Sequence, residues 1–314
     1  MVDYSFGDLR VLRAVAARGS FTAAAAELGY TQSAISKRVA ALEGTTGHRL
    51  VIRERKGVRL TRAGEVLLGH AAAALEAMED AQRELDGADA VRVRPVRLGA
   101  FASAAAGVVP GALGRLARDR PEVVVALREG TSAVLTRALR AGNLDIALLA
   151  SAPPYTPPDD REPVPDIEIL AEGPLCIVVG ASHRLAGRAH VHAAELTEER
   201  WVVARSEGQE RLLGVWPGSA GRPNVPYVVR DWLTKLRLVA SGVAITTIPD
   251  VLIPALPSDV QHVSIDGDAE RRRLLLVRVP GVTRPETQDV AQALRDAAAA
   301  TRATRLTPPR RRSS

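Results

Sequence analysis

The start of the chain follows a short amphipathic pattern that is typical of helices. Residues 8 to 18 carry Leu9, Leu12 and Val15 at helical spacing, and Gly19 follows them directly. Apolar residues three and four positions apart share one face of a helix, and glycine readily adopts the left-handed conformation that ends one. We therefore predict a first helix that stops at Gly19.

Two further helices follow with little chain between them. Ser20 is a suitable N-cap for the alanine-rich stretch 21 to 28, and Gly29 supplies the stop. Thr31 then caps a third helix that runs to about residue 43. Three short helices joined by tight turns predict a helix-turn-helix.

The third helix has two contrasting faces. Ile35, Val39 and Leu42 fall on one side and predict a buried stripe. The side chains on the opposite side are small and polar. A slim helix can enter the major groove of DNA, which is about 12 Å wide. Hydrogen-bond donors on its outer face can then reach base edges and phosphates. The alternative is a face that is merely solvated, as most polar stripes are. We expect DNA contacts from the start and the outer side of this helix: Thr31, Gln32, Ser33, Ser36, Lys37 and Arg38.

A β-hairpin is predicted after the third helix. Apolar and polar residues alternate in 49 to 54 and in 57 to 61, on either side of a basic turn. Such a wing can bring Arg53, Arg55 and Lys56 to the phosphate backbone or the minor groove. Charged turns also serve solubility alone, so both interpretations stay open.

A long amphipathic helix is predicted from Thr61 to about Leu85. Its apolar positions follow a 4-3 spacing, which is the seam of a coiled coil, and Leu68 and Leu75 widen the stripe. Two such helices should pair and make a dimer. The alternative is a helix that packs on its own domain. The seam consists of Leu67, Ala71, Ala74, Met78, Ala81 and Leu85.

The rest of the chain has the rhythm of an α/β fold with parallel strands. Short apolar strands alternate with helical stretches at 103 to 117 and 132 to 141. The chain crosses near 150 to 166 and returns near 264 to 268, which predicts two lobes with a cleft between them. The expected strands lie within 96–100, 123–129, 144–150, 175–181, 201–205, 227–230 and 244–249.

Ligands of open α/β sheets bind at the carboxyl ends of strands, where helices begin and unpaired amides favour an anion. The chain offers polar and small residues at these places. The alternative is that serine and threonine only cap helices, which they do more often. The candidates for effector contact are Phe101, Ala102, Ser103, Thr131, Ser132, Thr246 and Thr247, with Arg205, Trp232 and Lys235 as weaker candidates from the second lobe.

Composition narrows the class of protein. The 314 residues carry a formal net charge of +6, which favours an anionic partner, and aromatic residues make up 3%, which disfavours a stacking platform for single-stranded nucleic acid. The single cysteine, Cys176, excludes an intramolecular disulfide. Without a signal peptide or a long apolar run, we expect a cytoplasmic protein without a membrane partner.

Motifs for catalysis, metals and cofactors are missing. The chain contains no HExxH, GxSxG, GxxxxGK or GxGxxG, so we predict no enzyme activity and no cofactor. His190 and His192 share one face of an extended segment, but no third ligand is near in sequence, so we predict no metal site. The alternative to a DNA-binding regulator is a small-molecule binding protein without regulatory DNA binding. Loss of the polar pattern in the third helix would favour this alternative.

The chain resembles the LysR-type transcriptional regulators. The likeness is most specific over residues 19 to 64, which read GSFTAAAAELGYTQSAISKRVAALEGTTGHRLVIRERKGVRLTRAG. It continues in residues 118 to 148, RDRPEVVVALREGTSAVLTRALRAGNLDIAL, and in residues 236 to 250, LRLVASGVAITTIPD. The resemblance implies a mainly α winged helix-turn-helix, a long linker helix and a two-lobed α/β effector domain similar to periplasmic solute-binding proteins.

The resemblance also implies how the parts work together. A homodimer or homotetramer would bind double-stranded DNA, and a small effector, held near Ser103, Thr131 and Ser132 by a carboxylate, would change the bend of the DNA. The expected domains are 1–60 for DNA binding, 61–88 for the linker, 94–302 for effector binding (lobe I 94–163 and 267–302, lobe II 164–266) and 303–314 for a disordered basic tail.

Overall fold

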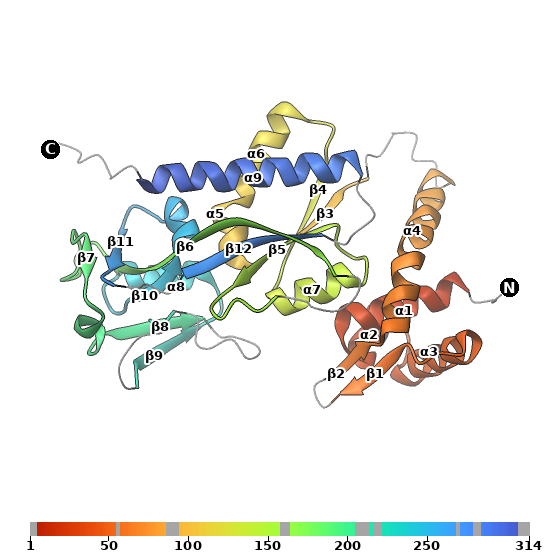
Figure 1. The fold of residues 1–314 in the computed structure, drawn as a ribbon. Helices are drawn as coiled ribbons and strands as arrows, with labels where there is room; N and C mark the ends of the chain where they lie inside the picture. The colour runs from red at the N-terminus through yellow and green to blue at the C-terminus, as the bar shows by residue number, and fades with distance from the viewer. Residues whose placement is uncertain are drawn as a thin grey trace.

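The computed structural model describes residues 5–54, 57–85, 94–157, 164–204, 214–216, 222–267, 271–278 and 284–306. A small helical domain at the N-terminus lies beside a larger α/β domain (Figure 1). In the described parts of the chain, no helix has the length and apolar character needed to cross a membrane.

The predicted helix-turn-helix is confirmed. Its helices are α1 (Phe6–Arg18), α2 (Phe21–Leu28) and α3 (Gln32–Thr46), so the third extends beyond the expected end at 43. Gly19 and Gly29 have left-handed φ values of 60° and 70°, and each ends its helix as predicted. The side chain of Ser20 accepts a hydrogen bond from the backbone N–H of Ala23, which caps α2.

The wing consists of strands β1 (Val51–Glu54) and β2 (Gly57–Leu60), which pair antiparallel. It is tied to the first turn of the domain, because the backbone N–H of Val58 donates to the carbonyl oxygen of Gly19 at 2.8 Å. Gly57 has a φ of 138°, and a Cβ there would collide with the Gly19 carbonyl oxygen. The wing base and the α1–α2 turn therefore form one unit.

Helix α4 (Arg62–Leu85) confirms the predicted long helix, and its apolar stripe is divided between two directions. Leu68 and Leu75 are buried, and Ala71 and Leu75 pack against Leu9 of α1. Met78 further along is 51% exposed. The first turns of α4 thus pack on their own domain, and the later turns leave apolar side chains uncovered.

The first lobe is built on a mixed sheet, so the prediction of a parallel sheet holds only in part. Strands β3 (Val96–Ala100), β4 (Val125–Glu129) and β5 (Ile146–Ser151) are parallel, in the order β4-β3-β5. Strand β12 (Arg271–Arg278) is inserted next to β5 and runs antiparallel to it. Strand β12 can run antiparallel to β5 because the chain enters this sheet from the second lobe and not through a helix of the first.

Helices cover both faces of this sheet. Ile146 and Leu148 of β5 lie in one core and Ala147 and Leu149 in another, as expected for a strand buried on both sides. The stretch 103–117 is not one helix but two, which meet at Val108, where the Pro110 ring favours a helix start. The covering helices are α5 (Ala102–Gly107), α6 (Val109–Asp119), α7 (Ser132–Arg140) and α9 (Pro285–Leu306).

The long strand β6 (Asp166–Gly180) belongs to both lobes. Its residues up to Pro174 pair with β12, and those from Leu175 onward pair with β10 (Thr246–Pro249) and β11 (Val260–Ile265). The expected start of lobe II at 164 is therefore too early, because the chain changes lobe inside a continuous strand. Figure 1 shows this strand running between the two halves.

The second lobe adds shorter elements around β6. Trp201 and Val203 of β8 (Arg200–Ala204) pack with Ile177 and Val179 of β6 in a shared core. The remaining elements are β7 (His190–Val191), β9 (Asn224–Val229), α8 (Trp232–Ala240) and the 3-10 helices Ala193–Leu196 and Asp250–Ala255.

One further boundary concerns the end of the effector domain. Helix α9 packs along α6 and continues to Leu306, past the expected start of a disordered tail at 303. Residues 307–314 lie outside the described residues.

The N-terminal domain also touches the effector domain, since α7 packs against α1 (Figure 1).

Candidate nucleic-acid interface and effector site

The start of α3 presents polar side chains to solvent. Gln32, Ser33 and Lys37 are exposed, whereas Ile35 and Val39 are buried against the rest of the domain. The hydroxyl of Thr31 accepts the backbone N–H of Ala34 at 3.2 Å and lies 3.1 Å from the Ser33 hydroxyl. The predicted division of the helix into a buried and an exposed face is confirmed.

The wing brings one of its predicted arginines to the helix. The guanidinium of Arg53 donates to the Ser36 hydroxyl at 3.0 Å, and it lies 5.0 Å from the ring centre of Phe21. A stacked and hydrogen-bonded guanidinium loses little further freedom on binding a phosphate. Arg55 and Lys56, which follow β1 in the sequence, lie outside the described residues.

Arg38 is placed differently from its neighbours on α3. Its guanidinium lies 3.5 Å from a carboxylate oxygen of Asp8 and 5.2 Å from the ring centre of Tyr30. The side chain is thus turned back toward the start of α1. Partly exposed ion pairs of this kind contribute about 0 to 1 kcal/mol, so Arg38 can exchange this contact for a phosphate at little cost.

Glu43 of α3 is a positioning residue that the sequence pattern did not reveal. Its carboxylate accepts the backbone N–H groups of Leu50 and Val51, at 2.7 and 3.2 Å. It therefore attaches the start of the wing to α3. The sequence pattern gives no sign of this role, because the partners of Glu43 are backbone groups seven and eight residues further along the chain.

In lobe I, two groups of predicted effector residues lie at the same edge of the sheet. Strands β3 and β4 pair in parallel with Ala100 opposite Glu129, so the chain positions that follow each strand are neighbours. Phe101, Ala102 and Ser103 follow β3, and Thr131 and Ser132 follow β4.

The hydroxyls at this edge already have roles in the fold. Thr131 caps α7 by accepting the backbone N–H of Val134 at 3.4 Å. Ser132 accepts the backbone N–H of Ala150 at 3.2 Å, which fastens α7 to β5. Ser103 is buried. Thr131 therefore caps its helix, and its oxygen keeps a second lone pair and its own proton, so the cap does not exclude contact with an effector.

In lobe II, the two predicted threonines turn their hydroxyls into the lobe. Thr246 is fully buried and donates to the carbonyl oxygen of Val202 at 2.9 Å. Thr247 is also buried and donates to the carbonyl oxygen of Val215 at 3.5 Å. Both residues lie on β10, as expected, but their hydroxyls point into lobe II and not toward a cleft.

Lys235 on α8 is buried, with 1% of its surface exposed, and its Nζ lies 4.6 Å from the ring centre of Trp232. Burial lowers the pKa of this amine to about 7. Trp232, the first residue of α8, is half-buried. Arg205, predicted with this group, lies outside the described residues.

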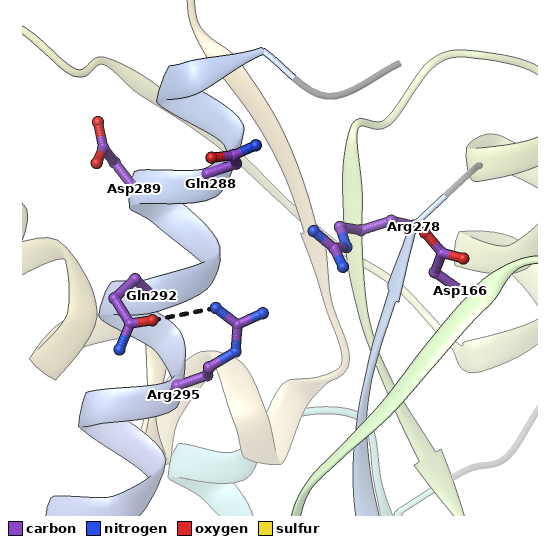
Figure 2. A pocket seen from close by; sticks show the side chains of 6 residues that line it. All are labelled: Asp166, Arg278, Gln288, Asp289, Gln292 and Arg295. Carbon is purple, nitrogen blue, oxygen red and sulfur yellow. Dashed lines mark hydrogen bonds between the residues drawn. The ribbon is translucent and has the colours of Figure 1, made fainter. Parts of the chain in front are cut away.

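A polar cavity of about 450 Å³ lies away from all predicted effector residues. It is an open hollow between α9 and the paired ends of β6 and β12 (Figure 2). Arg295 is held there by Glu168 at 2.8 and 2.9 Å, and this hydrogen bonding lowers the pKa of Glu168. The cavity thus mixes both signs of charge. Its lining residues are Asp166, Arg278, Gln288, Asp289, Gln292 and Arg295.

The histidines and the cysteine have structural surroundings. His190 and His192 both lie against Asp266, at 3.4 and 3.2 Å, on the exposed edge of lobe II. Within the described residues, no cluster of three or more acidic, histidine or cysteine side chains could hold a metal. Cys176 is a buried free thiol in β6.

Comparisons with known proteins agree with this architecture. The model of the bacterial regulatory helix-turn-helix of the LysR family matches residues 6–65, and the model of the LysR substrate-binding domain matches residues 90–299. The small neutral protease regulatory protein of Streptomyces coelicolor is 32% identical over 300 residues, covering 92% of this chain and 85% of that protein. The Hca operon transcriptional activator HcaR of Escherichia coli is 28% identical, with 90% and 94% covered.

Solved structures show the same fold. Full-length OxyR of Pseudomonas aeruginosa superposes with a TM-score of 0.56 at 20% identity, covering 94% of this chain and 95% of that chain. An OxyR variant of Corynebacterium glutamicum with hydrogen peroxide bound gives 0.51 at 24% identity, with 98% and 100% covered. The curated relatives are regulators, which confirms the prediction of a regulator rather than an enzyme. The chain belongs to the LysR family of bacterial transcriptional regulators, with an N-terminal helix-turn-helix and a two-lobed effector-binding domain.

Proposed function

We propose that this regulator reads a specific duplex sequence with the exposed face of α3, as a cytoplasmic homodimer or homotetramer. The observation that carries the proposal is the contrast between the exposed Gln32, Ser33 and Lys37 and the buried Ile35. Residues in the first turn of a recognition helix contact base edges, where glutamine and serine can pair with specific bases. Thr31 and Ser36 complete this surface.

The basic residues around α3 supply the phosphate contacts. Arg53 is already oriented beside Ser36, and Arg38 needs only to leave Asp8. Arg55 and Lys56 add charge at the tip of the wing. These contacts fix the register of the protein on DNA but carry no sequence preference.

The uncovered turns of α4 support a dimer. Met78 is 51% exposed on the predicted seam, and Ala74 beside it is also exposed. Pairing two α4 helices would cover these side chains and place two recognition helices about 34 Å apart on one face of the duplex.

The effector is a small anionic molecule bound at the strand ends of lobe I, against lobe II. The amides at the start of α7 and the hydroxyls of Thr131 and Ser132 suit a carboxylate. Phe101, Ala102 and Ser103 lie at the same edge, and Trp232 of lobe II supplies an apolar wall. The buried Thr246 and Thr247 would act by shaping lobe II rather than through their hydroxyls.

DNA binding is tested with the duplex upstream of the protein's own gene. We expect a salt-sensitive complex that prefers this duplex to a scrambled one. Gln32→Ala should cost about 1–3 kcal/mol on the preferred sequence and little on the scrambled one. Arg55→Ala should weaken both alike. Equal binding to the two duplexes by the unaltered protein would contradict the proposal and favour a small-molecule binding protein.

The effector class is tested by a thermal-shift screen of small carboxylates against matched neutral amides. A ligand at a hundred times its Kd stabilises the folded protein by about 2.7 kcal/mol, which is readily measured. Stabilisation by an amide and not by its carboxylate would contradict an anionic effector.

A further inference from the structure

Helix α7 has two ends with different neighbours. Its N-terminal end carries Thr131 and Ser132 at the proposed effector site, and its C-terminal end lies against the DNA-binding domain (Figure 1). Nine residues at about 1.5 Å each place these ends about 14 Å apart. The helix therefore spans the distance between the effector site and the DNA-binding domain.

The two faces of α7 explain how it serves both domains. Leu135, Ala138 and Leu139 pack into the core beneath the sheet of lobe I. Arg137 and Arg140 lie three residues apart on one face of the helix, and Ala141 directly follows the helix on that side. This second face meets the DNA-binding domain.

The contact between the domains is buried. Ala141 has no exposed surface and belongs to the same hydrophobic core as Val11, Ala14 and Val15 of α1. An apolar residue of one domain is thus part of the core of the other.

A buried ion pair closes the contact on its other side. Arg140 of α7 lies 3.6 Å from the carboxylate of Glu65 in the first turn of α4, with 10% and 6% of the two side chains exposed. Glu65 stands beside Thr61, the residue that caps α4 after the wing. The pair thus connects the effector domain to the point where the wing joins the long helix.

Arg137 lies across the turn between α1 and α2. A Cβ on Gly19 would be 3.5 Å from its Nε and 3.6 Å from the carbonyl oxygen of Val58. Among the described residues, this buried Nε has no hydrogen-bond partner. An unsatisfied buried donor costs free energy while α7 and the DNA-binding domain are in contact. This cost makes it easier for the two domains to separate.

We propose that the C-terminal end of α7 docks the DNA-binding domain on the effector domain of the same chain, and that this contact sets the direction of α3. The recognition face stays exposed in the docked arrangement, so docking does not block DNA. It determines how the two recognition helices of a dimer are oriented, and therefore how far DNA must bend to meet both. An effector at Thr131 would bias docking through α7; this last step rests on the proposed function.

Docking is tested without DNA, by the distance between spin labels on Thr45→Cys in α3 and Arg118→Cys in α6, both exposed sites. The labels are placed in a Cys176→Ala background and diluted with unlabelled chain, so that only distances within one chain are measured. We expect one narrow distance peak. Arg140→Glu, which faces Glu65 with a like charge, should reduce this peak about tenfold.

The swapped pair Glu65→Arg with Arg140→Glu should restore the peak, and Arg10→Glu, an exposed reversal on α1, should leave it unchanged. A broad distribution in the unaltered protein, an unchanged peak in Arg140→Glu, or no recovery in the swapped pair would overturn the proposal. DNA affinity is measured on the same samples. If the unaltered protein shows the narrow distance peak but does not prefer the upstream duplex to a scrambled one, the result counts against the proposed function and not against docking.

Discussion

The carboxylate of Glu43 on α3 accepts the backbone N–H of Leu50 at 2.7 Å, and this bond ties the start of the wing to α3. The same oxygen also accepts the N–H of Val51. Two backbone donors at the start of a strand therefore depend on one side chain. This side chain therefore helps to hold the wing at its angle to α3, together with the hydrogen bond from Arg53 to Ser36.

Glu43→Ala should destabilise the DNA-binding domain by about 1–3 kcal/mol, because it leaves two partly buried donors without a partner. Glu43→Gln, which retains an acceptor oxygen, should lose less. Urea unfolding measures the difference, with Thr45→Ala on an exposed turn of α3 as the control. Equal losses for Gln and Ala would show that the carboxylate charge, and not the hydrogen bonds, matters.

The pH dependence of stability should include a contribution from Asp145. Burial alone would raise its pKa, but hydrogen bonds from the side chain and backbone of Arg97, with the charges of Arg97 and Arg284, outweigh it and lower the pKa below 3.8. A lowered pKa stabilises the fold above about pH 4, and this stabilisation is lost as the pH falls through the folded-state pKa.

Asp145→Asn should therefore cost about 1–3 kcal/mol at pH 7 and flatten the decline in stability below pH 4. Unfolding free energies at pH 7 and pH 3 measure it. The exposed Asp119→Asn serves as the control and should leave the decline as it is. A decline in Asp145→Asn as steep as in the unaltered protein would refute the assignment.

Lys235 should make stability rise with pH above neutrality. Burial lowers its pKa to about 7 in the folded protein, against 10.5 for an ordinary lysine. Between these values the unfolded chain binds more protons than the folded one, so each pH unit adds at most about 1.4 kcal/mol to the stability. Below pH 7 the amine is protonated in both states, so its contribution to the pH dependence of stability ends there.

Lys235→Met removes the titrating amine, so its stability should rise less between pH 7 and 9 than that of the unaltered protein. Chemical unfolding at several pH values checks this, and Lys37→Met, at an exposed site, is the matched control. A rise in the stability of Lys235→Met between pH 7 and 9 as steep as in the unaltered protein would contradict the lowered pKa of this amine.

Thr131 should matter for both α7 and the effector. Thr131→Val removes the hydroxyl that caps the helix, at a cost of about 1 kcal/mol, and should abolish stabilisation by the carboxylate found in the screen. Thr131→Ser keeps a hydroxyl and should retain both. Thermal shifts with and without the carboxylate separate the two effects, and DNA affinity should not change. If Thr131→Val also loses DNA affinity, the residue supports the fold as a whole.

The sequence by itself determined the DNA-binding domain and its polar face. Its helices start at Ser20 and Thr31 and end at Gly19 and Gly29, because N-caps and left-handed glycines act over a few neighbouring residues. The buried stripe of α3 follows from spacing alone. The strands β3, β4 and β5 and the family were likewise predicted from local patterns and quoted motifs, whereas β7, β11 and β12 were not predicted.

Only the tertiary structure decided how distant segments meet. The insertion of β12 beside β5, the passage of β6 between lobes, and the inward hydroxyl of Thr246 depend on pairings between residues far apart in the chain. The same holds for Arg140 on Glu65. Periodicity shows which face of an element is apolar, but the partner that covers it is chosen by packing across the whole molecule.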